Sequence, residues 1–250
     1  MSKQFFGELI GTFILVFLGC GSVAGAVLFH AFEWLFQIAA IWGVAVALAI
    51  SVTAPLSGAH LNPAITLAFA TVDDFPKRKI PLYFAGQFLG AFLAASALYL
   101  LFASSISNME LSAGIIRGET GSEQSAKIFG EYYGPNTPMG IAFLAEFLGT
   151  ALLAFLVFTL IEKNTRTPLP NWLIAISIGG GLTILISIFA PLSMAGFNPA
   201  RDLAPRVFST LVGWKLHPFQ ANGMGWLVVY VLAPFLGGPT GAWLVKKLFH

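Results

Sequence analysis

Two stretches of this chain, "APLSGAHLNPAITLA" (Ala54–Ala68) and "APLSMAGFNPARDLA" (Ala190–Ala204), are near copies placed 136 positions apart. They agree at ten of fifteen positions, and both carry prolines and an asparagine in apolar surroundings. The similarity continues upstream, where "GELIGT" and "AEFLGT" place Glu8 opposite Glu146. Such internal similarity indicates two halves with one architecture.

The composition indicates that lipid surrounds most of the chain. Hydrophobic residues make up 57% of it, charged residues 10%, and the mean hydropathy is +0.81. A soluble domain carries about a quarter charged residues, and a membrane span needs about 20 mostly apolar ones. Six stretches qualify as spans: 5–28, 34–53, 81–103, 139–161, 171–189 and 224–245. The first lacks a clear small-residue cleavage site, so we expect it to be retained.

Positive charges gather at the termini and in the even-numbered connections between these spans. They are Lys3, Lys77, Arg78, Lys79, Lys163, Arg166, Lys246 and Lys247. With six spans they share one side of the membrane, which the positive-inside rule makes cytoplasmic. We therefore predict a multi-pass protein of the cell (plasma or inner) membrane with both termini in the cytoplasm.

The order of the segments predicts an inverted repeat. Each half consists of two spans, one broken segment and a third span, where "QFLGA" from Gln87 is similar to "PFLGG" from Pro234. Because each half has three spans, the second half enters the membrane from the opposite face. We predict an all-α membrane protein with one domain over 1–250, whose halves 1–103 and 139–250 are joined by an external loop, 104–138.

Each broken segment contains an Asn-Pro-Ala motif. The two motifs are Asn62, Pro63, Ala64 and Asn198, Pro199, Ala200. Proline suits the first turn of a helix, where its missing N–H costs nothing, and asparagine is a good N-cap. The motifs therefore predict short helices over 63–72 and 199–210. At about 1.5 Å per residue these are half-helices, too short to span the membrane.

The two half-helices enter from opposite faces, so their N-termini meet near the membrane midplane. Each N-terminus carries about half a positive charge, which repels cations. The residues before the half-helices can offer carbonyl acceptors: Gly58, Ala59, His60, Leu61, Ala195, Gly196 and Phe197. A lumen with amide donors at its centre and carbonyls along one wall favours neutral hydroxylated molecules over ions.

These motifs resemble those of the aquaporin family, on its aquaglyceroporin (glycerol facilitator) branch. The paired "SGAHLNPA" and "GFNPARD" segments are highly specific, and the resemblance covers nearly all 250 residues. Asp202 after Arg201, Arg206 after Pro205 and the Pro234–Phe235 pair resemble the glycerol-type pattern. The resemblance implies the aquaporin fold of six transmembrane helices and two half-helices. It also implies one pore per subunit and a homotetramer in the lipid bilayer.

Alignment with the family implies a narrow selectivity filter formed by Trp42, Ile186, Ala195 and Arg201. Trp42 would supply an apolar wall for a carbon backbone, and Arg201 would supply donors for hydroxyls. Both residues match those of the glycerol facilitators. Those channels have a glycine and a phenylalanine at the two positions where this chain has Ile186 and Ala195. The set found here looks more like that of the nodulin-type channels, which are multifunctional.

Other polar residues favour structural roles. Glu8 and Glu146 suggest either a proton relay or carboxylates that hold the irregular segments by accepting backbone N–H bonds, and their symmetric placement favours the second. We expect Asp202 to stabilise the start of its half-helix. We expect His60 to be a hydrogen-bonded structural histidine, and Cys20 a small apolar filler.

We predict a passive transmembrane channel for glycerol and similar small neutral solutes, and for water, that excludes ions and protons. One alternative is a multifunctional channel for lactic acid, urea, ammonia or metalloid acids. An alternative of another class is a proton-coupled secondary transporter, since inverted repeats occur there too. The chain contains no nucleophile–base pair and no metal signature, so we expect neither enzymatic activity, nor a metal, nor a cofactor, nor a nucleic-acid partner.

Overall fold

The computed structural model describes residues 2–166 and 168–249, without the side chains of 163–166, so those of Lys163 and Arg166 lie outside the described residues. Six helical segments are long and apolar enough to cross a membrane, and the described residues form helices, turns and loops, as predicted. The spans are α1 (Lys3–Phe29), α2 (Leu35–Ser57), α4 (Ile80–Ala113), α6 (Met139–Arg166), α7 (Asn171–Ser193) and a composite of α10 (Gly225–Leu227), the π-helical turn η3 (Val228–Leu232) and α11 (Ala233–Phe249).

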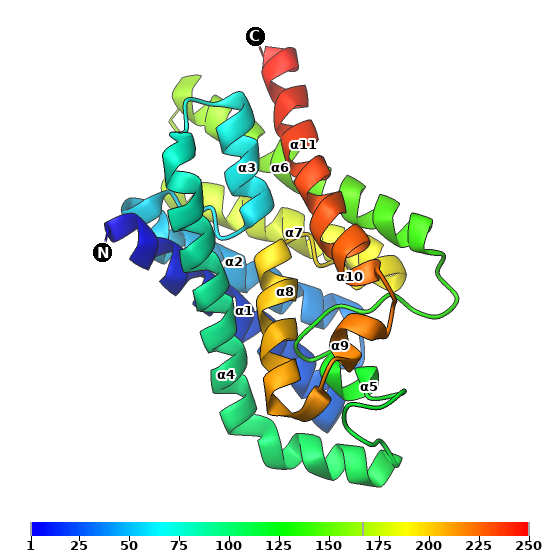
Figure 1. Cartoon of the computed structure of the whole chain (residues 1–250). Helices are drawn as coiled ribbons and strands as arrows, with labels where there is room; N and C mark the ends of the chain where they lie inside the picture. Colours follow the sequence, from blue (N-terminus) through cyan, green and yellow to red (C-terminus); the bar gives the residue numbers. More distant parts are fainter. Residues whose placement is uncertain (1, 167, 250) are drawn as a thin grey trace.

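Two short helices lie between the spans (Figure 1). The first, α3 (Pro63–Val72), has the predicted bounds, and the second, α8 (Pro199–Ser209), ends one residue early. A π-helical turn, η2 (Thr210–Trp214), continues from α8. The half-helix α3 packs on α11 and α8 packs on α4, so each half-helix is held by the opposite half of the chain. The remaining short elements are η1 (Lys77–Lys79), α5 (Glu123–Ala126) and α9 (His217–Gln220).

The helices that lead into the half-helices are longer than predicted. We expected spans 34–53 and 171–189 to stop before Pro55 and Pro191, but α2 and α7 continue through these prolines for two more residues. A proline removes only one helical hydrogen bond, and neighbouring groups can compensate for that loss within a bundle. Both helices end at a left-handed residue whose N–H donates to a carbonyl four residues back, 2.9 Å away.

Small residues let the spanning helices approach closely, which is how membrane helices pack without a hydrophobic driving force between them. Helices α2 and α7 meet at Gly43 and Gly179: a Cβ added to Gly179 would lie 2.4 Å from the carbonyl oxygen of Gly43. Helices α1 and α4 meet in the same way at Gly90, where an added Cβ would lie 2.3 Å from the carbonyl oxygen of Leu9. These glycines therefore allow the backbones of neighbouring helices to come into contact.

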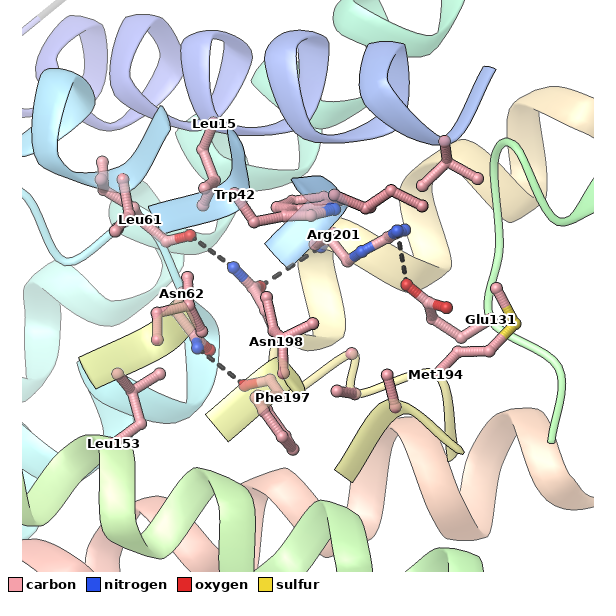
Figure 2. Close-up of a pocket in the computed structure, with 18 of the residues that line it drawn as sticks. Leu15, Trp42, Leu61, Asn62, Glu131, Leu153, Met194, Phe197, Asn198 and Arg201 are labelled. Carbon is pink, nitrogen blue, oxygen red and sulfur yellow. Dashed lines mark hydrogen bonds and ion pairs between the residues drawn. The ribbon is translucent and has the colours of Figure 1, made fainter. Parts of the chain in front are cut away.

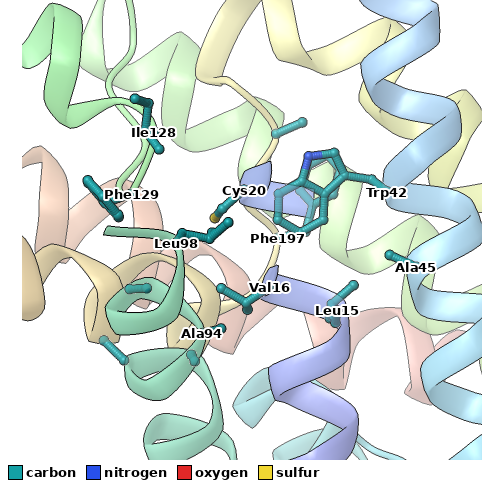
Figure 3. Close-up of a cluster of buried hydrophobic side chains, with 14 of the residues drawn as sticks. Leu15, Val16, Cys20, Trp42, Ala45, Ala94, Leu98, Ile128, Phe129 and Phe197 are labelled. Atoms are coloured by element: carbon teal, nitrogen blue, oxygen red, sulfur yellow. The ribbon is translucent and has the colours of Figure 1, made fainter. Parts of the chain in front are cut away.

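The connection between the halves differs from the predicted external loop 104–138. Helix α4 continues to Ala113 and ends at Gly114, whose left-handed φ of 66° caps it. Part of the loop then folds into the bundle, because Ile128 and Phe129 are fully buried beside Leu98 of α4 (Figure 3). Ile128 and Phe129 are core residues, so this part of the loop reaches the interior of the bundle.

Candidate functional site

A cavity of about 1170 Å³ runs through the bundle. Its lining extends from His30, just beyond the end of α1, to Asn171, at the start of α7. These helix ends lie on opposite faces of a bundle of six spans, so the cavity connects the two faces. The lining is apolar along the spanning helices and polar along two re-entrant segments, 58–62 and 194–198.

The two half-helices meet at their N-cap asparagines (Figure 2). The Oδ1 atom of Asn62 accepts from the backbone N–H of Ala64 at 2.8 Å, and Asn198 caps α8 in the same way. The Nδ2 atom of Asn62 donates to the carbonyl oxygen of Phe197 at 2.8 Å, and Nδ2 of Asn198 donates to that of Leu61 at 2.8 Å. An amide carries two N–H donors, so each asparagine keeps a second one for a solute in the cavity.

Three residues in each re-entrant segment have a left-handed backbone. They are Gly58 (φ 86°), Ala59 (53°), Leu61 (56°), Met194 (68°), Ala195 (60°) and Phe197 (51°). Only the first of them is a glycine, and for other residues this conformation costs about 1–3 kcal/mol each. Such strain persists only where the surroundings determine the backbone, so both segments need strong external support.

Two buried carboxylates provide that support. Glu8 accepts hydrogen bonds from the backbone N–H groups of His60 at 2.9 Å and Leu61 at 2.7 Å. Glu146 accepts from those of Gly196 at 2.9 Å and Phe197 at 2.6 Å. Hydrogen bonds to a charged acceptor are about twice as strong as neutral ones. Both predicted support residues therefore contact the strained backbone at equivalent places.

Each re-entrant segment is also supported by one tyrosine, which we did not predict. The hydroxyl of Tyr83 donates to the carbonyl oxygen of Ser57 at 2.6 Å, and that of Tyr230 donates to Ser193 at 2.9 Å. The signal was present in the sequence: extending the "QFLGA" and "PFLGG" match four residues upstream pairs Tyr83 with Tyr230.

The predicted filter residues line the cavity and are buried. The guanidinium of Arg201 lies over the ring of Trp42, with 4.5 Å between Cζ and the ring centroid. The ring lies against Gly19, where an added Cβ would be 2.3 Å away. Ile186 and Ala195 belong to the same buried cluster as Trp42. The structure thus brings an aromatic face, an arginine and two small or aliphatic side chains to one cavity.

The loop that joins the two halves reaches Arg201. Its Nη1 donates to the carbonyl oxygen of Phe129 at 3.2 Å, and its Nη2 forms an ion pair with Oε1 of Glu131. Asp202 does more than stabilise the start of α8: its Oδ1 accepts from the backbone N–H of Glu131 at 2.6 Å. Its carboxylate also binds Arg206. Sequence reasoning missed Glu131, since no local pattern pairs residues 70 positions apart.

His60 also lines the cavity. Its Nδ1 lies 3.1 Å from Oγ1 of Thr66, and its ring stacks on Phe69 with 4.3 Å between centroids. These contacts hold the imidazole against α3. Among the residues that the structure describes, no group of three or more His, Cys, Asp or Glu side chains could hold a metal ion.

Comparison with known proteins agrees with this geometry. A family model described as "Major intrinsic protein" matches residues 1–245. The chain is 38% identical to the glycerol uptake facilitator protein of Haemophilus influenzae, over 96% of this chain and 91% of that protein. It is 35% identical to the glycerol uptake facilitator protein of Escherichia coli K12, over 99% of this chain and 88% of that protein.

A solved structure has the same fold over almost its whole length. The aquaglyceroporin from Plasmodium falciparum superposes with a TM-score of 0.84 at 28% identity, covering 98% of this chain and 96% of that one. The match extends through both half-helices and all six spans. The chain belongs to the major intrinsic protein family, and within it to the aquaglyceroporin branch.

Proposed function

We propose that the chain is a passive channel that conducts glycerol, similar small neutral solutes and water across a membrane, and excludes ions and protons. The observation that carries this proposal is the contact between the two half-helices. Asn62 and Asn198 each donate across to the opposite half inside a cavity that connects the two faces. Two helix N-termini at one point favour a neutral solute oxygen over a cation.

In this proposal the filter is formed by Trp42, Ile186, Ala195 and Arg201. The indole face of Trp42 takes the carbon side of a polyol, and the guanidinium of Arg201 donates to its hydroxyls. The asparagines then receive the solute, and the carbonyl groups of both re-entrant segments accept from it. The relatives from Haemophilus influenzae and Escherichia coli are named as glycerol uptake facilitators, which supports glycerol as the solute.

Ile186 and Ala195 favour a broader solute range as the second candidate. An isoleucine narrows the cavity where a glycine would leave it open, and an alanine opens it where a phenylalanine would fill it. Both side chains are buried at the cavity lining. Urea, ammonia, lactic acid and neutral metalloid acids are therefore further solutes to measure beside glycerol.

A proton-coupled transporter is disfavoured by the surroundings of the two buried carboxylates. Glu8 accepts from two side chains, Ser57 and Gln87, in addition to two backbone N–H groups. Glu146 accepts from Ser193 and two backbone N–H groups. The oxygens of both carboxylates are thus occupied by donors that fix the re-entrant backbone, and neither carboxylate is among the residues that line the cavity.

The setting of the channel is also a proposal. We place it in the cell membrane with both termini cytoplasmic, because the basic residues at the start of α4 and the end of α11 share that side. We propose a homotetramer with one pore per subunit. Exposed apolar side chains on α2 and α7, such as Val44, Leu48 and Ile184, support an outer surface that lipid or neighbouring subunits cover.

Stopped-flow light scattering on proteoliposomes tests the proposed function. After a glycerol gradient is applied, vesicles holding the protein should re-swell several times faster than protein-free vesicles of the same lipid. Equal rates in the two preparations would contradict the proposal. Running the other neutral solutes on the same vesicles ranks them against glycerol.

A further inference from the structure

Glu131 and Arg201 form an ion pair at the cavity, and both side chains are only 3% exposed. Oε1 of the carboxylate contacts the guanidinium, whereas Oε2 is buried and has no hydrogen-bond partner among the described residues. Figure 2 shows the carboxylate of Glu131 beside the guanidinium of Arg201. A carboxylate with an unpartnered buried oxygen is costly, so its presence here needs a reason.

The backbone of Glu131 is held by the helix that carries the arginine. Its N–H donates to Oδ1 of Asp202 at 2.6 Å, and its carbonyl oxygen accepts from Nη2 of Arg206. Arg201, Asp202 and Arg206 all lie on α8. The loop residue and the half-helix therefore form one unit, and the side chain of Glu131 stays beside Arg201.

A lone guanidinium in a buried constriction would carry a full positive charge. Removing one partner of a buried ion pair leaves an uncompensated charge, which is strongly unfavourable. A free guanidinium also binds small carboxylates strongly, through two parallel hydrogen bonds. A neutral solute would then compete with anions for Arg201, which only the carbonyl oxygen of Phe129 and the ring of Trp42 would still hold among the residues described.

We infer that Glu131 is a positioning residue of the filter: it holds Arg201 against Trp42 and cancels its charge, so that solutes pass a neutral pair. This inference rests on the proposed channel function. It adds a residue from the external loop to a filter otherwise built from the two halves. It also assigns this part of the loop a role in solute selection.

The ionisation of Glu131 then controls the pair. Burial raises the pKa of its carboxyl to about 7, although the charge of Arg201 opposes this shift. The pair is therefore half formed at about pH 7, nearly complete one pH unit above it and mostly lost one unit below it. The titratable and charged groups that face Glu131 from the packed elements are Cys20, Tyr132, Glu146, Arg201, Asp202, Arg206 and Tyr230.

Glycerol flux into proteoliposomes, measured at equal pH on both sides and with or without formate, tests this inference. For the unaltered protein we expect flux to fall up to about tenfold between about pH 8 and about pH 6, as the carboxylate fraction falls. Formate should block the flux at the lower pH only. Glu131→Gln should show low flux and formate block at both pH values, because its arginine is never neutralised.

Glu123→Gln is the matched control. Glu123 lies in α5 of the same loop and pairs with His217 at 2.8 Å, but it does not line the cavity. This variant should keep the pH profile and the formate response of the unaltered protein. A merely structural role for Glu131 would produce neither response.

A flat pH profile without formate block in the unaltered protein would overturn the inference, as would a Glu131→Gln variant that keeps the pH step. If that variant fails to fold, the pH and formate responses of the unaltered protein still decide. Absence of any glycerol flux above protein-free vesicles would instead contradict the proposed channel function.

Discussion

At the scale of single residues, the proposed filter contains an arginine held between an aromatic ring and a carboxylate. Arg201 lies 4.5 Å from the centroid of Trp42 and pairs with Glu131. In this proposal the remaining aperture depends on Ile186 and Ala195, the two positions at which the predicted filter differs from the glycerol-facilitator pattern. Substituting these two residues therefore tests the filter assignment.

We expect Ile186→Gly combined with Ala195→Phe to raise glycerol flux relative to urea flux by about tenfold, because one extra or missing methylene group in an apolar pocket is worth about 10- to 200-fold in discrimination. The measurement is the ratio of the two rates in the same proteoliposomes. Ile184→Gly is the control, since this neighbouring α7 side chain is 60% exposed on the outer surface. An unchanged ratio in the double variant would remove these positions from the filter.

Local and family patterns named candidate residues for the site, but not every contact among them. Asn62, Asn198 and Arg201 were found because each belongs to a short motif. Glu131 was not, because its partner lies 70 positions away and nothing nearby in the sequence marks it. Such a pairing follows from the way the loop folds into the bundle, which only the tertiary structure reveals.

At the scale of elements, the half-helices and close helix crossings place the site. The starts of α3 and α8 were predicted because an asparagine followed by a proline is a strong local signal. The ends of α2 and α7 were not, because packing within the bundle compensates for the bond that each proline removes. The burial of Ile128 and Phe129 was missed because the loop around them is polar and was expected to lie outside the bundle.

Gly179→Ala should destabilise the protein, because its Cβ would lie 2.4 Å from the carbonyl oxygen of Gly43 and backbone cannot yield as a side chain can. Overpacking of this kind costs about 1–3 kcal/mol, which corresponds to a fall of about 2–10 °C in the thermal midpoint. Gly180→Ala introduces the same methyl group where nothing lies within 4 Å, and should be neutral or slightly stabilising. The measurement is the thermal unfolding midpoint of each variant in detergent. Equal midpoints for the two variants would contradict the close α2–α7 packing described above.

At the scale of the whole molecule, the inverted repeat produces one path to which both halves contribute equivalent elements. Each half contributes a half-helix, a strained re-entrant segment and a carboxylate that holds it, and each half-helix packs on the opposite half. The sequence predicted the repeat, the six spans and the all-helical architecture. Long apolar stretches mark the spans, and two near-identical segments mark the repeat. A structure of this kind supports downhill passage through a preformed cavity.

The endpoint of radiolabelled glycerol uptake into proteoliposomes distinguishes a passive channel from a coupled transporter. If glycerol passes through an open path, its internal concentration should rise until it equals the external one, whatever proton gradient is imposed across the membrane. The pH can change the rate of glycerol uptake through Glu131, but it should not change the final internal concentration. Accumulation above the external concentration, driven by a proton gradient, would contradict the account.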